Sequence, residues 1–458
     1  MPNTPGHLID ELRWRGLVHQ ITDEVGLRKH LETPGRKIYA GFDPTSDSLT
    51  IGNLVPMMML VHVARHGHVP VAVQGGATGL IGDPSGKQAE RTLQTPEMVD
   101  ARVKAQRPIF ERVFANADVP APTILNNYDW ISKLTWIEAL RDIGKHFSVN
   151  MMIQKDSVKS RLESRDQGIS YTEFSYMLMQ AYDFAHLHKT FGVTVQMGGS
   201  DQWGNIVGGC DLIRRTAFSS IECVENKTIP DGVQPENNTE VFGLTAPLVT
   251  KADGTKFGKT ESGAIWLSAP SGPEDHSSAR TSAFAYYQFW LNALDADVIK
   301  YLKIYTLLTQ EEIAALDSAH AANPSAREAH RALAHHATAI LHGPEAAHQA
   351  EAAAKALFSG EIAGLDARTL DEVLAGAPTS TLDKGRLEGA GVPLVDLLVE
   401  TGLAKSKRES REFLQNGSVL VNGLATGVEA VATTADLLHG SIIALRRGKK
   451  NWHVTRWR

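Results

Sequence analysis

The chain has few cysteines and no long apolar run. Its two cysteines, Cys210 and Cys223, supply neither a disulfide framework nor a Cys-x-x-Cys zinc site. The amino-terminal segment contains Asp10 and Glu11 and lacks the apolar stretch of a secretion signal. The most apolar run, residues 54–64, is too short to span a bilayer. We therefore expect a cytoplasmic protein in a reducing setting that is neither secreted nor inserted in a membrane.

The composition is that of a globular protein with several domains. Of the 458 residues, 42% are hydrophobic and 21% are charged, which excludes collagen-like and disordered classes. At about 150 residues per domain, this length predicts roughly three domains. We find no internal repeat with the period of a solenoid.

Acidic residues are absent from the carboxyl-terminal end. From residue 440 onward all charged residues are basic, and they are Arg446, Arg447, Lys449, Lys450, Arg456 and Arg458. Removing these six from the 46 basic residues leaves 40 against 52 acidic ones, so residues 1–439 carry -12 while the whole chain carries -6. The pattern suits a nucleic-acid partner, and an ordinary solvated basic terminus would suit it equally well.

A strand, a helix and a second strand are predicted early in the chain. Residues 37–42 and 69–74 are short apolar runs of strand length, and residues 54–66 between them are apolar over a helical length. This βαβ order predicts a parallel sheet with a right-handed crossover. Ligands of such sheets bind outside the carboxyl ends of the strands, where residues 41–53 and 75–83 would lie.

A helical region and a linker are predicted next. Residues 281–358 are rich in alanine, place apolar residues at helical spacing and are interrupted near Asn323 and Pro324. Residues 360–392 contain many turn-forming residues and are interpreted as a linker.

The last segment predicts a small α+β module. Residues 394–400 form an apolar helix, and Ser406 with Glu409 forms a capping box at the start of a second helix. Residues 419–421 then form a short strand. One face of the second helix is basic, with Lys407, Arg408 and Arg411 on neighbouring turns. Together with the basic tail, this helix predicts an RNA-binding surface.

The stretch at residues 41–53 joins the first strand to the first helix and carries phosphate-binding residue types. Its Thr45, Thr50 and Asn53 side chains can donate to phosphates at a helix start, and Gly52 permits a close approach to the backbone. An ordinary capped turn would contain the same residue types.

A second stretch, residues 75–87, is rich in glycine and follows the second strand. It ends at Lys87, one helical turn before Arg91, so two cations can face a polyphosphate. One glycine-rich loop is a weak signal, and two on the same sheet are a stronger one.

The third stretch, residues 251–260, places Lys256 and Lys259 among glycines and threonines. Such a loop can close on a pyrophosphate leaving group and stabilise charge that develops in the transition state. In isolation, a solvated surface loop would explain it as well.

Taken together, these blocks resemble those of bacterial tyrosyl-tRNA synthetases, which are class I aminoacyl-tRNA synthetases. The resemblance spans residues 39–53, 75–91, 141–150, 168–176, 198–205 and 256–260. It implies an α/β, Rossmann-like parallel-sheet catalytic domain with a dimer-forming insertion over residues 1–272. It further implies an α-helical anticodon-binding domain over 273–358, a linker over 359–392, and an α+β RNA-binding domain over 393–458 of the type shared with ribosomal protein S-four.

The resemblance also implies a reaction. The chain would activate L-tyrosine with ATP, form tyrosyl-adenylate and pyrophosphate, and transfer tyrosine to the terminal ribose of its tRNA. Mg²⁺ would accompany ATP without a dedicated protein metal site, and the enzyme would be a homodimer. No side-chain nucleophile is needed, because positioning and charge stabilisation would drive the reaction.

Site residues follow from the resemblance position by position. The tyrosine pocket falls on Tyr39, Asp83, Tyr176, Gln180, Asp183 and Gln202. Asp183 as acceptor and Tyr39 as donor or relay would satisfy a buried phenol, and such a site would reject phenylalanine. The ammonium would be held by Tyr176, Gln180 and Asp83.

The remaining assignments concern ATP and RNA. ATP would contact Gly41, Asp43, Gly52, Gly199, Asp201 and Lys259. The catalytic set that meets the phosphates comprises Thr45, Thr50, Asn53, Lys87, Arg91, Lys256, Lys259 and Thr260. The tRNA-binding set comprises Lys405, Lys407, Arg408, Arg411, Arg446, Arg447, Lys449 and Lys450.

The chain departs from the family pattern at the signature His-Ile-Gly-His, where it has Thr50 and Asn53 in place of the two histidines. The tryptophanyl enzymes resemble this version, so we expect altered rather than abolished adenylation. Ala40 replaces a cysteine common in the family. Residues 219–239 resemble an insertion, and a surface loop is the expected form.

Two other functions remain open at this point. The chain could be a paralogue that activates tryptophan, although Tyr39 and Asp183 suit a phenol. It could also be a catalytically degenerate RNA-binding protein, although RNA binding alone would need neither the pocket residues nor the lysine pair.

The clustered histidines could form a metal site by spacing alone. No Cys-x-x-Cys or His-Glu-x-x-His motif accompanies them. We therefore expect structural or helix-surface roles for His62, His66, His68, His335 and His336.

Overall fold

The computed structural model describes residues 6–83, 94–154, 158–159, 162, 169–224, 239–252, 257–260, 263–272, 275, 277–448 and 451–458. The chain divides into two compact units, one formed by residues 1–270, 277–281 and 292–343 and the other by residues 271–276, 282–291 and 344–458. Among the described helices, none has the length and apolar character needed to cross a membrane.

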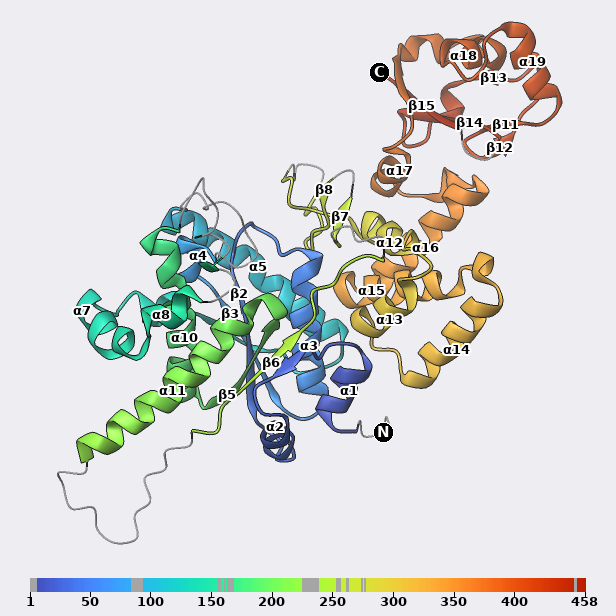
Figure 1. The fold of residues 1–458 in the computed structure, drawn as a ribbon. Helices are drawn as coiled ribbons and strands as arrows, with labels where there is room; N and C mark the ends of the chain where they lie inside the picture. The colour runs from blue at the N-terminus through green and yellow to red at the C-terminus, as the bar shows by residue number, and fades with distance from the viewer. Residues whose placement is uncertain are drawn as a thin grey trace. The chain divides into compact units, whose positions relative to one another are not determined.

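A six-stranded sheet forms the centre of the first unit, in the order β1-β6-β5-β2-β3-β4 (Figure 1). The strands are β1 (Gln20–Ile21), β2 (Lys37–Phe42), β3 (Val69–Gln74), β4 (Thr123–Asn126), β5 (Val193–Gly199) and β6 (Phe242–Ala246). All neighbours pair in parallel except β1, which runs antiparallel to β6 at the edge. The two strands expected at residues 37–42 and 69–74 are confirmed.

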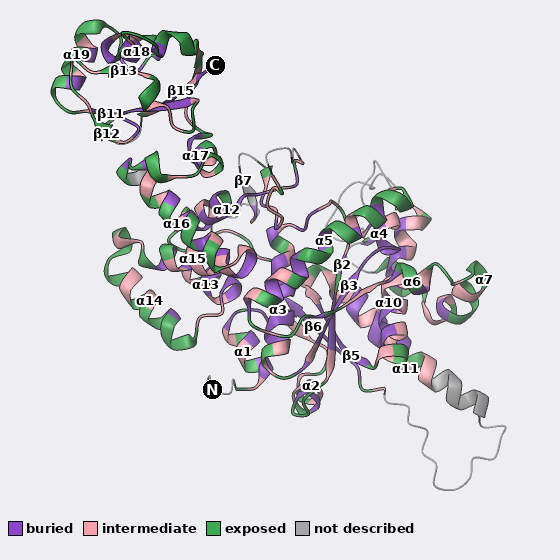
Figure 2. Ribbon diagram, turned by 180° about the vertical axis from the view of Figure 1, so that it is seen from behind, coloured by how far each residue is buried: buried purple, intermediate pink, exposed green. Residues whose placement is uncertain are grey.

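Helices cover both faces of this sheet. The apolar helix α3 (Leu54–Arg65) packs on β2 and β3. The helix α10 (Tyr171–Phe191) packs on β5, and α11 (Trp203–Val224) packs on β5 and β6. Because both faces are covered, β3 is buried along almost its whole length. Figure 2 shows this burial along the strands and α3. The expected helix at residues 54–66 is thus confirmed, ending one residue early.

The other elements of the first unit lie before, between and after the strands. They are α1 (Leu8–Trp14), α2 (Glu24–Leu31), η1 (Ile51–Asn53), α4 (Thr78–Ile81), α5 (Pro96–Asn116), α6 (Tyr128–Ile131), α7 (Trp136–Glu138), η2 (Ala139–Ile143), η3 (Gly144–His146), α8 (Val149–Ile153), η4 (Ser200–Gln202), β7 (Lys259–Thr260), β8 (Gly263–Ala264), α13 (Val298–Tyr305), α14 (Gln310–Ala322), η5 (Pro324–Ala326) and α15 (Glu328–His342). The expected break at Asn323 is confirmed, since α14 ends there.

The second unit contains a five-stranded sheet in the order β12-β11-β14-β15-β9. Its strands are β9 (Thr379–Leu382), β11 (Val419–Val421), β12 (Leu424–Ala425), β14 (Ile442–Arg447) and β15 (Asn451–Trp457), and a separate pair is formed by β10 (Val392–Pro393) and β13 (Val431–Ala432). The helical elements are α12 (Ala283–Leu291), α16 (Pro344–Ser359), η6 (Ile362–Gly364), α17 (Ala367–Leu374), η7 (Lys384–Leu387), α18 (Leu394–Glu400), α19 (Lys407–Gln415) and η8 (Thr434–Asp436).

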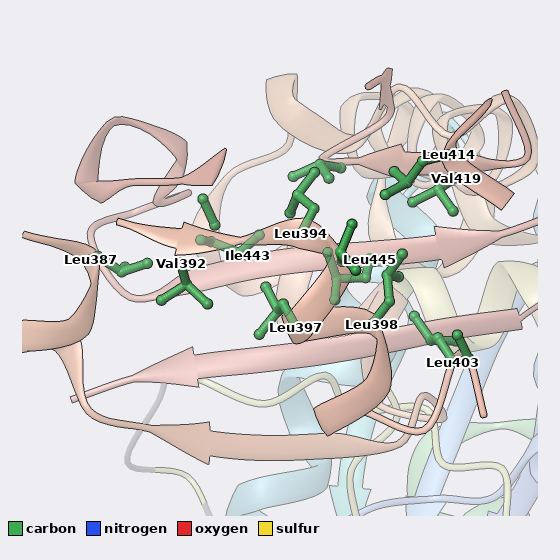
Figure 3. Close-up of a cluster of buried hydrophobic side chains, with 14 of the residues drawn as sticks. Leu387, Val392, Leu394, Leu397, Leu398, Leu403, Leu414, Val419, Ile443 and Leu445 are labelled. Carbon is green, nitrogen blue, oxygen red and sulfur yellow. The ribbon is translucent and has the colours of Figure 1, made fainter. Parts of the chain in front are cut away.

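Each face of this second sheet packs on its own helices. Ile443 and Leu445 of β14 meet the apolar side of α18, with Leu394, Leu397 and Leu398 (Figure 3). Ile442 and Ala444, which alternate with them along the strand, join a cluster that includes residues of α16 and α17. The expected helix at 394–400 and strand at 419–421 are confirmed.

The structure differs from the sequence reading over residues 360–392. This stretch contains α17 and β9, and β9 pairs in parallel with β15. The strand is short, reads Thr-Ser-Thr-Leu and lies at the sheet edge, so it has no apolar pattern that would distinguish it from a turn-rich linker. The expected helical region is also divided, with α13, α14 and α15 in the first unit and α12 and α16 in the second. The domain boundaries themselves stay a prediction.

Two further expectations concern local detail. Ser406 caps α19 by accepting from the Glu409 N–H, while the Glu409 carboxylate accepts from the Lys405 N–H rather than from Ser406. Of the expected insertion at residues 219–239, the first residues extend α11 to Val224, and residues 225–238 lie outside the described part.

Candidate functional site

A hollow of about 650 Å³ opens where β2, β3, β5 and β6 end. This is the edge at which ligands of parallel sheets bind. Among the residues that line it are the following expected ones: Tyr39, Gly41, Asp43, Thr45, Thr50, Gly52, Asn53, Asp83, Tyr176, Gln180, Asp183, Gly199, Asp201 and Gln202. The fold therefore gathers residues from β2, α10 and the segment after β5 into one place.

Asp183, on α10, is a buried carboxylate at this hollow. Its Oδ2 accepts from Asn127 Nδ2 at 2.9 Å, and its Oδ1 accepts from Trp130 Nε1 at 2.7 Å. Burial raises the pKa of Asp183 to about 7, and the two hydrogen bonds act against this rise. Two neutral donors therefore fix the orientation of the carboxylate, and no ion pair to it is formed by the described residues.

Tyr39, on β2, contributes a buried hydroxyl to the hollow. The residue is 2% exposed, and its phenol oxygen has no hydrogen-bond partner among the described residues. A buried polar atom without a partner is costly unless something else satisfies it. Because Asp183 and Tyr39 line the same hollow, a ligand hydroxyl could bond to both.

A second carboxylate, Asp43, accepts from two side chains in the hollow and is linked through one of them to a third. Asp43 Oδ2 accepts from the Tyr176 hydroxyl at 2.9 Å, and Oδ1 accepts from the Thr78 hydroxyl at 2.7 Å. Thr78 Oγ1 in turn accepts from Asn127 Nδ2 at 3.0 Å, which connects Asp43 to Asp183. Burial, together with the negative charge of Asp43, raises the pKa of Tyr176, so its hydroxyl stays protonated. Asp43, expected among ATP contacts, is thus bonded to the tyrosine-pocket set.

Amide side chains form a hydrogen-bonded network that includes Asp83. Gln202 Nε2 donates to Asp83 Oδ2 at 2.6 Å, and Asn205 Nδ2 donates to Gln180 Oε1 at 3.0 Å and to Gln202 Oε1 at 3.3 Å. Burial and the charge of Asp83 raise the pKa of Asp201 nearby. The carboxylate and carbonyl oxygens form an acceptor-rich region that suits a cation such as an ammonium group.

The signature turn precedes α3 and is closed by its own side chains. Asn53 Oδ1 accepts from both the N–H and the hydroxyl of Thr50, at 3.0 and 2.9 Å. Its carbonyl oxygen is therefore in use, and the amide NH₂ is the group that Asn53 can offer to a phosphate. A Cβ added to Gly52 would meet Thr50 Oγ1 only at 3.7 Å, so a ligand can approach this backbone closely.

The lysine stretch is described in part. Lys256 lies outside the described residues, as do Lys87 and Arg91, and of Lys259 and Thr260 only the backbone is described. The described Gly258 accepts from Ile265 N at 3.0 Å, and Ile265 accepts from Ile51 N at 3.0 Å. Backbone hydrogen bonds thus connect the end of this stretch to the signature turn.

The basic residues of the second unit divide into two groups. Lys405, Lys407, Arg408 and Arg411 are exposed on and before α19, and Lys407 pairs with Asp396 at 2.7 Å. Arg446 and Arg447 instead bond within the unit, as their guanidinium groups donate to Ser359 O at 3.1 Å and to Leu403 O at 2.6 Å. Lys449 and Lys450 lie outside the described residues.

The histidines for which we expect structural or helix-surface roles differ in their burial. His62 and His68 are buried, His66 is half-buried and contacts the His62 carbonyl, and His335 and His336 are half-buried on α15. Burial lowers the pKa of His62 and His68, which keeps these imidazoles neutral.

Sequence reasoning missed four residues of the site. These are Thr78, Asn127, Trp130 and Asn205, which hold the pocket carboxylates and amides in place. Asn127 could have been found, because it follows β4 at the edge where the other strands end. Trp130 carries no local signal, since its role depends on α6 meeting α10.

Comparisons with known proteins identify the family. Residues 32–359 match the family model for tRNA synthetases class I (W and Y), and residues 370–455 match the tyrosine-tRNA ligase SYY-like C-terminal domain. The chain is 48% identical over 454 residues to a tyrosine-tRNA ligase of Bacillus caldotenax, covering 98% of this chain and 99% of the relative. It is 46% identical over 452 residues to one of Dechloromonas aromatica, with the same coverage.

A solved structure is similar to a large part of the chain. It is a C-terminally truncated mitochondrial tyrosyl-tRNA synthetase of Aspergillus nidulans, 30% identical, with a TM-score of 0.65 over 78% of this chain and 95% of that one.

Proposed function

The chain belongs to the class I tRNA synthetases of the tyrosine and tryptophan group and acts as a tyrosine-tRNA ligase, and on that premise we propose how its residues share the reaction. The assignment rests on two buried groups that line the same hollow. One is the Asp183 carboxylate, and the other is the Tyr39 hydroxyl, which has no partner among the described residues.

The tyrosine phenol would lie between these two groups. It would donate to the Asp183 carboxylate, which Asn127 and Trp130 hold in one orientation by donating to it. The phenol oxygen would accept from the Tyr39 hydroxyl. Phenylalanine would leave both protein groups unpaired in a buried site, so it would be rejected strongly. The same geometry disfavours tryptophan, whose indole N–H donates but cannot accept.

The ammonium end would lie against oxygen acceptors. The Tyr176 hydroxyl donates to Asp43, so its oxygen lone pairs can accept from the ammonium. Asp83 and Gln180 supply further acceptors, held by Gln202 and Asn205. Fixing both ends of tyrosine directs its carboxylate toward the α-phosphorus of ATP.

ATP would lie over the start of α3, near Gly52, with its ribose near Gly199 and Asp201. Thr45 and the Asn53 amide would donate to its phosphates as neutral groups, and Thr50 would join them by turning its hydroxyl away from Asn53 Oδ1. The helix start favours negative charge there. We assign charge stabilisation on the leaving pyrophosphate to Lys87, Arg91, Lys256, Lys259 and Thr260, on the family pattern alone. Mg²⁺ would enter bound to ATP, as part of the substrate.

We propose that the second unit holds the tRNA during the transfer step. The support is the exposed basic set Lys405, Lys407, Arg408 and Arg411. The four predicted domains, 1–272, 273–358, 359–392 and 393–458, and a cytoplasmic location belong to the same proposal.

A homodimer is part of the proposal as well. Large apolar side chains are exposed together on α7, η2 and α8: Trp136, Ile137, Leu140, Val149 and Met151. A monomer rarely exposes an apolar patch of this kind, so a second copy of the chain would cover it.

ATP-pyrophosphate exchange tests the assignment of the pocket. We expect exchange with tyrosine and only background exchange with phenylalanine, tryptophan or no amino acid. Exchange with tryptophan instead of tyrosine would replace the proposed substrate, and absence of any exchange by the folded protein would favour a degenerate RNA-binding role.

A further inference from the structure

The orientation of the Asp183 carboxylate depends on a side chain from outside the hollow. Trp130 Nε1 donates to Asp183 Oδ1 at 2.7 Å, and Trp130 is not among the described residues that line the hollow. The helix that carries it, α6, spans only Tyr128–Ile131, a length at which a helical backbone alone has little stability. The indole therefore needs side chains of other elements to hold it in place.

His186 on α10 supplies that support. Its imidazole lies on the Trp130 indole, with ring centroids 4.8 Å apart and an angle of 13° between the ring planes. Nearly parallel rings at this separation form a stacked pair, which stabilises the contact beyond the area that it buries. His186 follows Asp183 by three residues, so both side chains lie on the same side of α10. The indole thus contacts this helix twice, through its N–H and through its face.

Two further rings hold the imidazole itself. The ring centroids of Tyr182 and Phe191 lie 6.1 and 6.2 Å from that of His186, with the planes inclined by 51° and 59°. Both residues also pack against the buried cluster that contains Trp130 and Tyr39. The imidazole is therefore enclosed by rings that belong to the same core as the tyrosine pocket.

The imidazole stacks as a neutral ring. Burial lowers the pKa of His186, and the positive charges of Lys189 and Lys133 act in the same direction. A neutral ring stacks through its flat shape and its π-system, so another flat ring of similar size can take its place. Phenylalanine at this position should therefore support the indole, whereas alanine should not.

We propose that His186 is a positioning residue for tyrosine recognition, because it holds the Trp130 indole where its N–H keeps the Asp183 carboxylate directed at the substrate hydroxyl. His186 is not among the described residues that line the hollow, so it acts through Trp130. The inference rests on the proposed function and deepens it, since it extends the determinants of substrate choice to a residue outside the pocket.

ATP-pyrophosphate exchange with the full chain carrying His186→Ala tests the proposal. Without the stacked ring the indole gains freedom and its hydrogen bond to Asp183 weakens. We therefore expect the KM for tyrosine to rise about fivefold with kcat nearly unchanged. Phenylalanine has no hydroxyl for Asp183 to bind, so its Ki as a competitive inhibitor of tyrosine exchange should stay the same. A general loss of structure would instead raise both constants.

Two further variants separate stacking from a loss of fold. His186→Phe retains a flat ring and should keep the KM of the unmodified chain. Trp130→Phe removes the N–H donor, so adding His186→Ala to it should raise the KM for tyrosine little further. Thr190→Ala is the matched control, because Thr190 is exposed on the same helix, and it should leave both constants unchanged. Thermal unfolding shows that each variant is folded at the assay temperature.

Three results would overturn the inference. One is an unchanged KM for tyrosine in His186→Ala, and another is an equal rise of this KM and of the Ki for phenylalanine. The third is a KM in the double variant equal to the product of the two single effects. If the unmodified chain shows no tyrosine-dependent exchange, the proposed function fails and this inference with it. Normal exchange by the unmodified chain together with any of the three results contradicts the role of His186 alone.

Discussion

At the scale of single residues, Asp183 combines a structural cost with a binding role. Burial holds its pKa at about 7, far above the ordinary value of 3.8. Since the folded protein retains this proton to higher pH than the unfolded chain, the free energy of unfolding falls as pH rises from about 4 through 7. The ligand-free enzyme therefore carries a carboxylate that destabilises it near neutral pH.

Binding of tyrosine should show the opposite pH dependence. The phenol donates to an ionised Asp183, so only the deprotonated fraction of the enzyme is competent to bind it. Between pH 8 and pH 6 that fraction falls about tenfold, and the apparent Kd for tyrosine should rise by the same factor. Fluorescence or calorimetric titration across this range measures the effect. In Asp183→Asn the affinity should be lower and nearly independent of pH, and a pH dependence that persists in this variant would contradict the assignment.

Replacing Tyr39 should stabilise the fold and weaken tyrosine binding. Its hydroxyl is buried without a partner in the described structure, so Tyr39→Phe removes an unsatisfied polar atom. We expect the free energy of unfolding to rise by about 1 kcal/mol while the Kd for tyrosine rises about tenfold. Denaturant unfolding and exchange kinetics measure the two changes. A variant that is both less stable and fully active would show that the hydroxyl bonds within the protein instead.

At the scale of elements, the strands and helices that could be predicted are those whose own sequence shows an apolar pattern. Residues 37–42 and 69–74 are mostly apolar, and most of them are buried because both faces of the sheet are covered. The strand β9 was not predicted, because its position depends on pairing with β15 and its side chains show no apolar pattern. The pocket residues follow the same division: Asp183 and Tyr39 were assigned through the family resemblance and line the hollow, whereas Trp130 depends on how α6 meets α10.

The helix α13 holds the described ends of the lysine stretch. Asp297 Oδ2 accepts from Ala252 N at 2.9 Å, and Lys300 Nζ donates to Thr250 O at 2.7 Å. Phe257, adjacent in sequence to Lys256, stacks on Tyr305 with ring centroids 5.5 Å apart. These contacts fix both sides of the stretch to a helix outside the sheet.

Weakening the contacts between the lysine stretch and α13 should lower the rate of catalysis more than the affinity for tyrosine. We expect Phe257→Ala to lower kcat for ATP-pyrophosphate exchange about tenfold, because the neighbouring lysines would be less well positioned toward the transition state. The KM for tyrosine should stay nearly constant, since the tyrosine pocket is formed by other elements. Phe257→Tyr, which retains the ring, is the control and should retain most of kcat. A raised KM with unchanged kcat would place Phe257 in substrate binding instead.

At the scale of the whole molecule, the position of β9 determines where the chain can be shortened. Truncation after residue 393 would remove β14 and β15 but leave α17 and β9, exposing the apolar residues that Ile442, Ala444 and Val454 cover. Truncation after residue 359 would remove the whole sheet together with α17, while α12 and α16 keep their mutual packing. The two shortened chains differ by residues 360–393, which include α17 and β9, and should behave differently.

We expect the chain ending at residue 359 to form tyrosyl-adenylate at a rate close to that of the full chain, because every described lining residue of the catalytic hollow is retained. Its aminoacylation should fall at least tenfold through a higher KM for tRNA, since the exposed basic residues of α19 are lost. The chain ending at residue 393 should aggregate or unfold at a lower temperature, because its leftover apolar surface has no partner in the sheet. Exchange, aminoacylation and thermal unfolding of both chains measure these effects. Equal thermal stability of the two would show that α17 and β9 do not depend on the carboxyl-terminal sheet.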